Sequence, residues 1–119
     1  MQLRVIFPFK VSTNKYFRMN HHPRSELNNA IYLTTLDAVR KEKLESITTF
    51  LIKMRYTFFQ NGTLLDASNC SGMAKALEDG LVKAGVMPDD NPRYVKGIEI
   101  NSERNKTKGM PYCIIETYE

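Results

Sequence analysis

The stretch FLIKMRYTFF, residues 50–59, has the clearest strand pattern in this chain and decides the class of fold that we expect. Apolar side chains at positions 52, 54, 56 and 58 alternate with polar side chains at positions 53, 55 and 57. Alternation indicates a β-strand with one buried face, because successive side chains point to opposite sides of a sheet. The sequence therefore predicts a strand that buries four apolar residues and exposes Lys53 and Arg55 on its other face.

A turn and a helix are predicted directly after this strand. Asn61-Gly62 is a dipeptide typical of turns. From about residue 69 to residue 84, apolar side chains recur at the spacing of one helical face. Gly85 then provides a C-terminal stop, because glycine readily adopts the left-handed conformation that ends helices. The residues of the predicted apolar stripe are Cys70, Met73, Leu77, Leu81 and Ala84.

The N-terminal part of the chain has weaker signals. QLRVIF, residues 2–7, alternates polar and apolar residues and is a predicted first strand. The segment from there to Arg24 has no clear period and contains two prolines, which predicts a long loop. Residues 30–33 are predicted as a short strand, and Thr34 or Thr35 as the cap of a helix that runs to about residue 46.

Two more strands are predicted at residues 94–101 and 112–118, joined by the basic turn RNKTKG. The order of elements predicts an α+β fold, with a small mixed β-sheet of about four strands and two helices packed on one face. At 119 residues the chain is expected to form a single domain.

Composition and charge restrict the class of protein. The 17 Lys and Arg residues outnumber the 13 Asp and Glu residues, which is compatible with an anionic partner. No stretch approaches the roughly 18 apolar residues of a membrane span, and the N-terminus lacks the apolar run of a signal peptide. The two cysteines suggest neither a zinc cluster nor a disulfide framework, so we expect an intracellular protein without a membrane partner.

One side of the predicted helix at residues 69–84 carries charges. Counted from Lys75, Glu78 is three residues on and Asp79 four, so all three are expected on one side of the helix, opposite Leu77. Ser71 lies one turn before Lys75. An ordinary solvated face, with a Lys–Asp pair that contributes a few tenths of a kcal/mol, explains this pattern. So does a metal site, and the sequence leaves both readings open.

A metal site would require the carboxylates of this helix to lie close to carboxylates from another segment of the chain. Asp89-Asp90 follows Pro88 and is equally compatible with a simple turn. Mg²⁺ binds oxygen ligands, typically one or two carboxylates together with water and substrate phosphate. A lysine close to such an ion could stabilise the charge that develops on a phosphate during cleavage.

The N-terminal segment is a candidate nucleic-acid surface. It has no acidic residue before Glu26, and Tyr16 and Phe17 are interleaved with its cations. Cations suit a phosphate backbone and aromatic rings suit unstacked bases. A surface loop with its aromatic rings in the core is the alternative. Two adjacent histidines, His21 and His22, are not expected to bind a metal. The cations of the segment are Arg4, Lys10, Lys15, Arg18 and Arg24.

Three segments together resemble the RusA family of Holliday junction resolvases. FPFKVSTNKYFR, residues 7–18, is similar to the family's opening, S-x-N-[KR]-x-[YF]-R after an apolar strand and a proline. AIYLT, residues 30–34, is similar to its second short strand. KALEDGLVKAGVMPDD, residues 75–90, is similar to K-x-x-x-D-x-L…G…D-D without a gap. The order and spacing of these motifs carry the resemblance, which covers most of the chain.

The resemblance implies a function. Members of this family are small homodimers, common in phages and prophages, that cut four-way DNA junctions symmetrically with Mg²⁺ or Mn²⁺ and leave 5′-phosphate ends. A member would therefore act in recombination and repair, in the cytoplasm of a bacterial host. The family's lysine corresponds to Lys75, and the last aspartate of its D-D pair, a metal ligand, corresponds to Asp90.

The chain departs from the family at the D-x-D-N motif that precedes the lysine. Without a gap, the two carboxylate positions fall on Asn69 and Ser71. With a shift of three residues the match becomes DASN, residues 66–69, in which Asp66 is retained and Ser68 takes the second position. We prefer the shifted match, because Asp66 then precedes the helix that carries Lys75. Neutral oxygens bring no charge to offset Mg²⁺, and Asp79 is expected to compensate.

The expected site follows from this match. Lys75, Asp66 and Asp90 are the expected catalytic residues. The expected metal ligands are Asp66, Asp79 and Asp90, with Ser68 as a weaker one. The expected DNA contacts are Lys15 and Arg18, with Arg24, Lys53 and Arg55 as weaker candidates.

Two other functions remain open from the sequence. With a carboxylate missing, the protein could bind branched DNA without cutting it. It could also be a small interaction module whose basic surface is incidental. Cleavage and binding of a synthetic junction separate these alternatives.

Overall fold

A four-stranded mixed sheet forms one layer of the protein. The computed structural model describes residues 1–7, 10–46, 51–89 and 91–118. The strands lie in the order β1-β4-β2-β3, in which β2 and β3 are parallel and the other neighbours are antiparallel. The strands are β1 Gln2–Ile6, β2 Ile52–Gln60, β3 Val95–Arg104 and β4 Tyr112–Tyr118.

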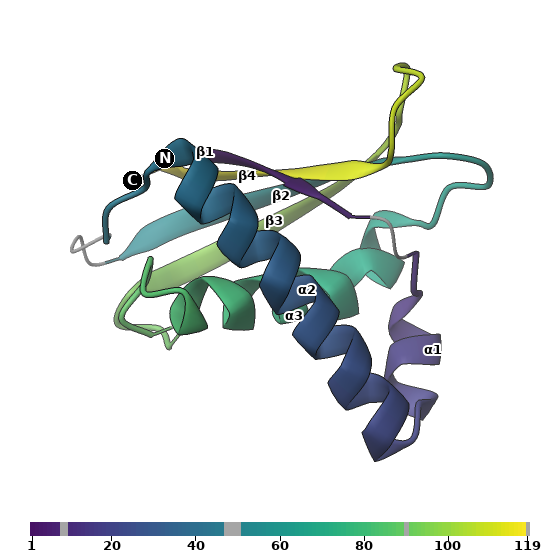
Figure 1. Ribbon diagram of the computed structural model, residues 1–119, viewed down its shortest axis with the longest axis horizontal. Helices are drawn as coiled ribbons and strands as arrows, with labels where there is room; N and C mark the ends of the chain where they lie inside the picture. The colour runs from purple at the N-terminus through teal and green to yellow at the C-terminus, as the bar shows by residue number, and fades with distance from the viewer. Residues whose placement is uncertain (8–9, 47–50, 90, 119) are drawn as a thin grey trace.

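Two long helices cover one face of this sheet and leave its other face open (Figure 1). This arrangement confirms the predicted α+β class. A shorter helix, α1, contacts the start of α3. The helices are α1 Thr13–Arg18, α2 His21–Glu42, the 3₁₀ helix η1 Ala67–Cys70 and α3 Ser71–Lys83.

The predicted pattern of β2 is confirmed. Its side chains alternate between buried and more exposed positions along the strand. Met54 and Tyr56 are completely buried under the helices, whereas Lys53 points to the open face. β2 is paired on both sides, so its apolar face lies at the centre of the core. Position 50 lies outside the described residues.

The predicted loop up to Arg24 is wrong, because residues 13–18 form α1. The Ser12 hydroxyl caps this helix by accepting a hydrogen bond from the main-chain N–H of Lys15 at 3.1 Å. Ser–Thr–Asn at positions 12–14 was a helix-start signal, since serine and asparagine satisfy the free N–H groups of a first turn. Tyr16 is buried, which anchors the short helix to the rest of the molecule.

The predicted short strand at residues 30–33 and the predicted helix start at Thr34 or Thr35 are also wrong. One helix, α2, runs from His21 to Glu42 and ends at Lys43, which has a left-handed φ of 51°. Pro23 lies in its first turn, where a missing N–H costs nothing. Within residues 30–33 only Ile31 is buried, and it lies on the face of this helix that packs on the core, where buried positions recur three and four apart. Its buried residues are Ile31, Thr35, Ala38 and Val39.

The helix predicted from about residue 69 is confirmed as η1 followed by α3, and its apolar stripe is buried at Cys70, Met73, Leu77 and Leu81. Gly85 has a φ of +79° and follows the last turn, as predicted. The strands predicted at residues 94–101 and 112–118 are confirmed as β3 and β4. Among the described helices, none has the length and apolar composition needed to cross a membrane.

Candidate functional site

The outer side of α3 borders a hollow of about 380 Å³ that we call the acidic hollow. Asp79 lines it from α3, and Asp89 lines it from the segment after that helix. Asn28 and Tyr32 of α2 form the opposite wall, and Lys83 contributes a cation. Two carboxylates that are ten positions apart in sequence therefore border the same space.

The predicted pair between Lys75 and Asp79 is confirmed. The Lys75 Nζ lies 3.3 Å from Oδ1 of Asp79, and both side chains are more than half exposed. An exposed ion pair of this kind contributes little stability, because water screens it. The pair does hold an ammonium group next to a carboxylate that faces the acidic hollow.

Glu78 does not share this side of the helix, which corrects the predicted grouping with Lys75 and Asp79. It is 3% exposed, and its Oε2 accepts a hydrogen bond from the Tyr56 hydroxyl at 3.2 Å. Burial raises the pKa of Tyr56 well above its ordinary value, and the neighbouring Glu78 carboxyl raises it further. α3 is covered by both the sheet and α2, so its buried surface is wider than one apolar stripe.

Asp66 and Ser68 lie before the other end of α3. Asp66 is exposed and lines a separate hollow with Asn101 and Glu103. The main-chain oxygen of Ser68 accepts hydrogen bonds from the hydroxyls of Thr13, at 3.3 Å, and Ser71, at 3.0 Å. This corner therefore joins α1 to the start of α3.

The length of α3 keeps Asp66 away from the acidic hollow. α3 begins at Ser71, and Asp66 lies before it in the chain. Asp79 lies eight residues after Ser71, which is about 12 Å along the axis of the helix. Ligands of one Mg²⁺ lie about 2 Å from the ion. No cluster of three His, Cys, Asp or Glu side chains suited to a metal occurs within the described part of the chain. Asp90 lies outside the described residues.

Three of the predicted DNA contacts lie on or next to α1. Lys15 and Arg18 are exposed, and the Arg24 guanidinium lies 5.9 Å from the centre of the Tyr16 ring. Tyr16 belongs to the core and its hydroxyl donates to Oδ1 of Asn28 at 2.8 Å, whereas Phe17 is exposed. Each of the two predicted alternatives therefore holds for one aromatic ring: Tyr16 is buried, and Phe17 is exposed to solvent.

The other two predicted DNA contacts, Lys53 and Arg55, lie on the open face of the sheet. The Arg55 guanidinium bonds the carboxylate of Glu99 at 2.7 Å and lies 3.8 Å from that of Glu116. The hydrogen bond with Glu99 raises the pKa of Arg55. Arg55 is therefore already neutralised by carboxylates, and the predicted contacts fall into two separate groups.

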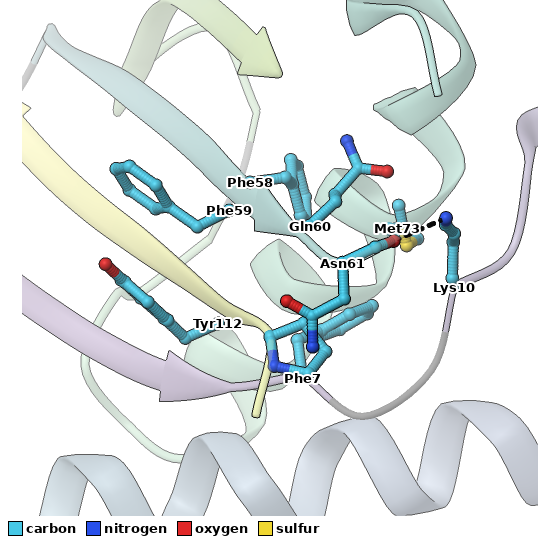
Figure 2. A pocket seen from close by; sticks show the side chains of 9 residues that line it. Phe7, Lys10, Phe58, Phe59, Gln60, Asn61, Met73 and Tyr112 are labelled. Atoms are coloured by element: carbon cyan, nitrogen blue, oxygen red, sulfur yellow. Dashed lines mark hydrogen bonds between the residues drawn. The ribbon is translucent and has the colours of Figure 1, made fainter. Parts of the chain in front are cut away.

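A second cavity was not predicted from the sequence. We call it the aromatic pocket; it has a volume of about 240 Å³ and lies where β2 ends and β4 begins (Figure 2). Its residues come from four separate segments, so no local pattern could have indicated it. It is lined by Phe7, Lys10, Phe58, Phe59, Gln60, Asn61, Met73, Pro111 and Tyr112.

A scan of protein-family models found no match to the chain, and a search of curated proteins found none either. The function must therefore be inferred from the residues and their arrangement.

Proposed function

We propose that the protein is a Mg²⁺- or Mn²⁺-dependent endonuclease that cuts four-way DNA junctions symmetrically. The observation that carries this proposal is the acidic hollow, where Asp79 and Asp89 face one space and Lys75 lies beside Asp79. These residues belong to the segment whose order and spacing resemble the RusA family. Such an activity belongs to DNA recombination and repair, in the cytoplasm of a bacterial host.

The donor set of the hollow suits a hard divalent ion. Asp79 and Asp89 supply carboxylate oxygens, and Asp90 is the next residue in the chain. Two carboxylates with water and substrate phosphate make an ordinary Mg²⁺ site. A bound ion would supply Lewis-acid activation of the phosphate and of water. Asp66 and Ser68, which border other surfaces, are not assigned to this ion.

Lys75 has a separate part in the proposed reaction. Its ammonium group lies 3.3 Å from Asp79, one helical turn away, so it places positive charge beside one of the carboxylates that line the hollow. Negative charge increases on the phosphate oxygens during cleavage, and a fixed cation stabilises that charge. Removal of the ammonium group should therefore lower the rate of cleavage more than the affinity for DNA.

Lys15 and Arg18 are the proposed DNA backbone contacts. Both are exposed on α1, which contacts the start of α3. Contacts of lysine and arginine with phosphates release counterions, so binding should weaken as salt increases. Replacing both residues with glutamine should lower the slope of log affinity against log salt by about two.

The free edge of β1 is the proposed homodimer surface, because symmetric cleavage needs two copies of the site. β1 pairs only with β4 among the described strands. The exposed apolar side chains Ile6 and Leu33 border one hollow there, together with Arg4, Asp37 and Lys41. A twofold contact brings the same patch of each copy together, so acids of one copy can face cations of the other. Sedimentation of Leu33→Asp tests this, with a shift to monomer expected.

Cleavage of a synthetic four-way junction by the purified protein tests the proposed activity. We expect paired nicks with Mg²⁺ or Mn²⁺ that disappear in Asp79→Asn and in Asp90→Asn. Glu26→Gln is the matched control, because Glu26 is also an exposed carboxylate in an i,i+4 pair, with His22. Binding of the junction without nicking in both metals would contradict the proposal.

Binding of branched DNA without cleavage is the second candidate. It is favoured by the place of Asp66 outside the acidic hollow and by the use of Ser71 as a hydrogen-bond donor within the fold. It predicts that Asp79→Asn binds the junction as tightly as wild type or more tightly, with no cleavage by either protein. Absence of any DNA binding at about 50 mM salt would instead favour a small interaction module.

A further inference from the structure

We propose that the aromatic pocket holds one unstacked nucleobase of the branched DNA. This rests on the proposed function, because it names the part of the DNA that a second site would bind. Figure 2 shows the pocket between the end of β2 and the segments that carry Phe7, Lys10 and Tyr112. The bases at the centre of a junction are the least constrained by pairing, so they are the easiest to unstack.

The size of the pocket suits one ring system. Its volume of about 240 Å³ lies below the roughly 300–1,000 Å³ of pockets for drug-sized ligands. Apolar side chains supply most of its walls, with Phe7 and Phe58 in edge-to-face contact at 5.8 Å. Such walls favour a flat, mostly apolar group.

Two aromatic side chains that line the pocket stack on each other. The Phe59 and Tyr112 rings are stacked at 4.7 Å with an angle of 18° between their planes. The Arg4 guanidinium lies 4.0 Å from the centre of the Tyr112 ring. Because Phe59 and Arg4 already lie against the Tyr112 ring, a base would extend this stack from the Phe59 side or replace the Arg4 guanidinium on Tyr112.

Polar groups at the mouth fit the rest of a nucleotide. The Lys10 ammonium donates hydrogen bonds to the main-chain oxygens of Asn61, at 2.8 Å, and Thr63. An ammonium group has three donors, so a third remains for a phosphate. The exposed Asn61 amide carries both donors and an acceptor, which are the groups that bind base edges.

The segment next to the pocket gives the charge that a nucleic acid needs. Residues 104–112 contain three cations and no acid, and Lys106 and Lys108 are exposed. Asn105 holds this segment in shape, because its side chain accepts from the N–H of Thr107 at 3.0 Å and donates to the oxygen of Gly109 at 3.2 Å. A preformed basic segment beside an aromatic pocket matches a chain of anionic phosphates and planar bases.

The test compares the affinity of Tyr112→Ala for a four-way junction and for a paired duplex of the same sequence. We expect a loss of about 5- to 150-fold for the junction, which is the usual effect of removing a stacking ring, and less than twofold for the duplex. Tyr118→Ala is the matched control, because Tyr118 lies on the same strand and borders Arg55 instead of the pocket. It should change neither affinity.

Two further measurements show whether a base enters the pocket. Abasic sites at the junction centre should weaken binding by wild type but not by Tyr112→Ala, because that variant has already lost the stacking contact. Asn61→Phe should block the pocket without altering the core, since Asn61 is exposed at a turn. It should reproduce the selective loss of junction affinity.

Each alternative outcome is distinguishable. Equal losses with Tyr112→Ala and Tyr118→Ala, or no effect of abasic sites on wild type, overturn the pocket proposal alone. A change in the sedimentation of Asn61→Phe without a change in DNA affinity also overturns it and assigns the pocket to a protein contact. Absence of junction binding by wild type overturns the proposed function, and the base pocket with it.

Discussion

Glu78 and Asp79 are adjacent acids on α3 with opposite environments. Glu78 is 3% exposed and bonds the Tyr56 hydroxyl in the core, whereas Asp79 is 57% exposed and pairs with Lys75 at the acidic hollow. Only Asp79 can reach an ion or a substrate. The inner side of α3 thus maintains the fold and the outer side is available for chemistry, although the two acids are consecutive in the sequence.

The width of the buried side explains this difference. α3 contacts the sheet, where Tyr56 of β2 bonds its Glu78, and packs on α2, so alanines and glycines as well as the apolar stripe are buried. Successive residues of a helix point about 100° apart around its axis. Glu78 therefore still lies on the wide buried side, whereas the next residue, Asp79, points away from it. If the two sides are as distinct as their contacts indicate, substitutions should affect either stability or cleavage, and seldom both.

The largest expected effect is on stability, for Leu77→Ala on the inner side. Leu77 is completely buried, so the variant should lower the free energy of unfolding by about 2–5 kcal/mol. Urea denaturation followed by circular dichroism measures this. A loss below about 1 kcal/mol would show that α3 is not held as tightly as its burial indicates.

The next effect is on cleavage, for Asp79→Ala on the outer side. We expect the rate of the proposed metal-dependent junction cleavage to fall about 100-fold or more, because Asp79 is a proposed metal ligand and changes beside metal ligands already cost about 10- to 100-fold. Its unfolding midpoint should match wild type, since the carboxylate is exposed. Equal loss of stability and activity would contradict the separation of the two sides.

Tyr56→Phe tests the buried acid. Removing the hydroxyl takes away a hydrogen bond to the Glu78 carboxyl, and a buried group that loses a partner costs about 1–3 kcal/mol. Cleavage by the folded variant should be unchanged. Tyr32→Phe, on α2, is the control and should stay within about 0.5 kcal/mol of wild type in urea.

Alkaline pH should lower the stability of the fold through two buried groups of the sheet, Cys113 and Tyr56. Burial raises the pKa of Cys113 well above its ordinary 9.0 and that of Tyr56 well above its ordinary 10.0. The folded state therefore retains protons that the unfolded state loses, and stability should fall by about 1.4 kcal/mol per pH unit for each group once pH exceeds that group's unfolded pKa. Denaturation midpoints should be level near pH 8 and fall above about pH 9. Cys113→Ala should reduce the first part of the decline, to which Cys70 also contributes because burial raises the pKa of its thiol.

The smallest expected effect on stability is that of Lys75→Met. Breaking its exposed pair with Asp79 should change the free energy of unfolding by less than about 0.5 kcal/mol. The proposed junction cleavage should nevertheless fall, because the cation beside Asp79 is lost. A stability loss above about 1 kcal/mol would mean that the outer side also holds the fold.

The elements that could be predicted are those in which the spacing of apolar residues along the sequence matches the positions that are buried. The alternation around Met54 indicated β2, and the stripe through Leu77 indicated α3. The N-terminal helices were not predicted, because proline occurs in loops as well as in the first turn of a helix, and isoleucine favours strands as well as buried helix faces. Pro23 and Ile31 both fit a helix once α2 packs on α3 and β1.

Only the part of the candidate site that depends on local helix spacing could be predicted from the sequence. The i,i+4 spacing of Lys75 and Asp79 fixes their proximity on any helix, so the sequence alone determined that pair. The burial of Glu78, the position of Asp89 on the same hollow as Asp79, and the aromatic pocket all depend on which elements pack together. Those packing contacts join residues far apart in the chain, so only the tertiary structure decided them.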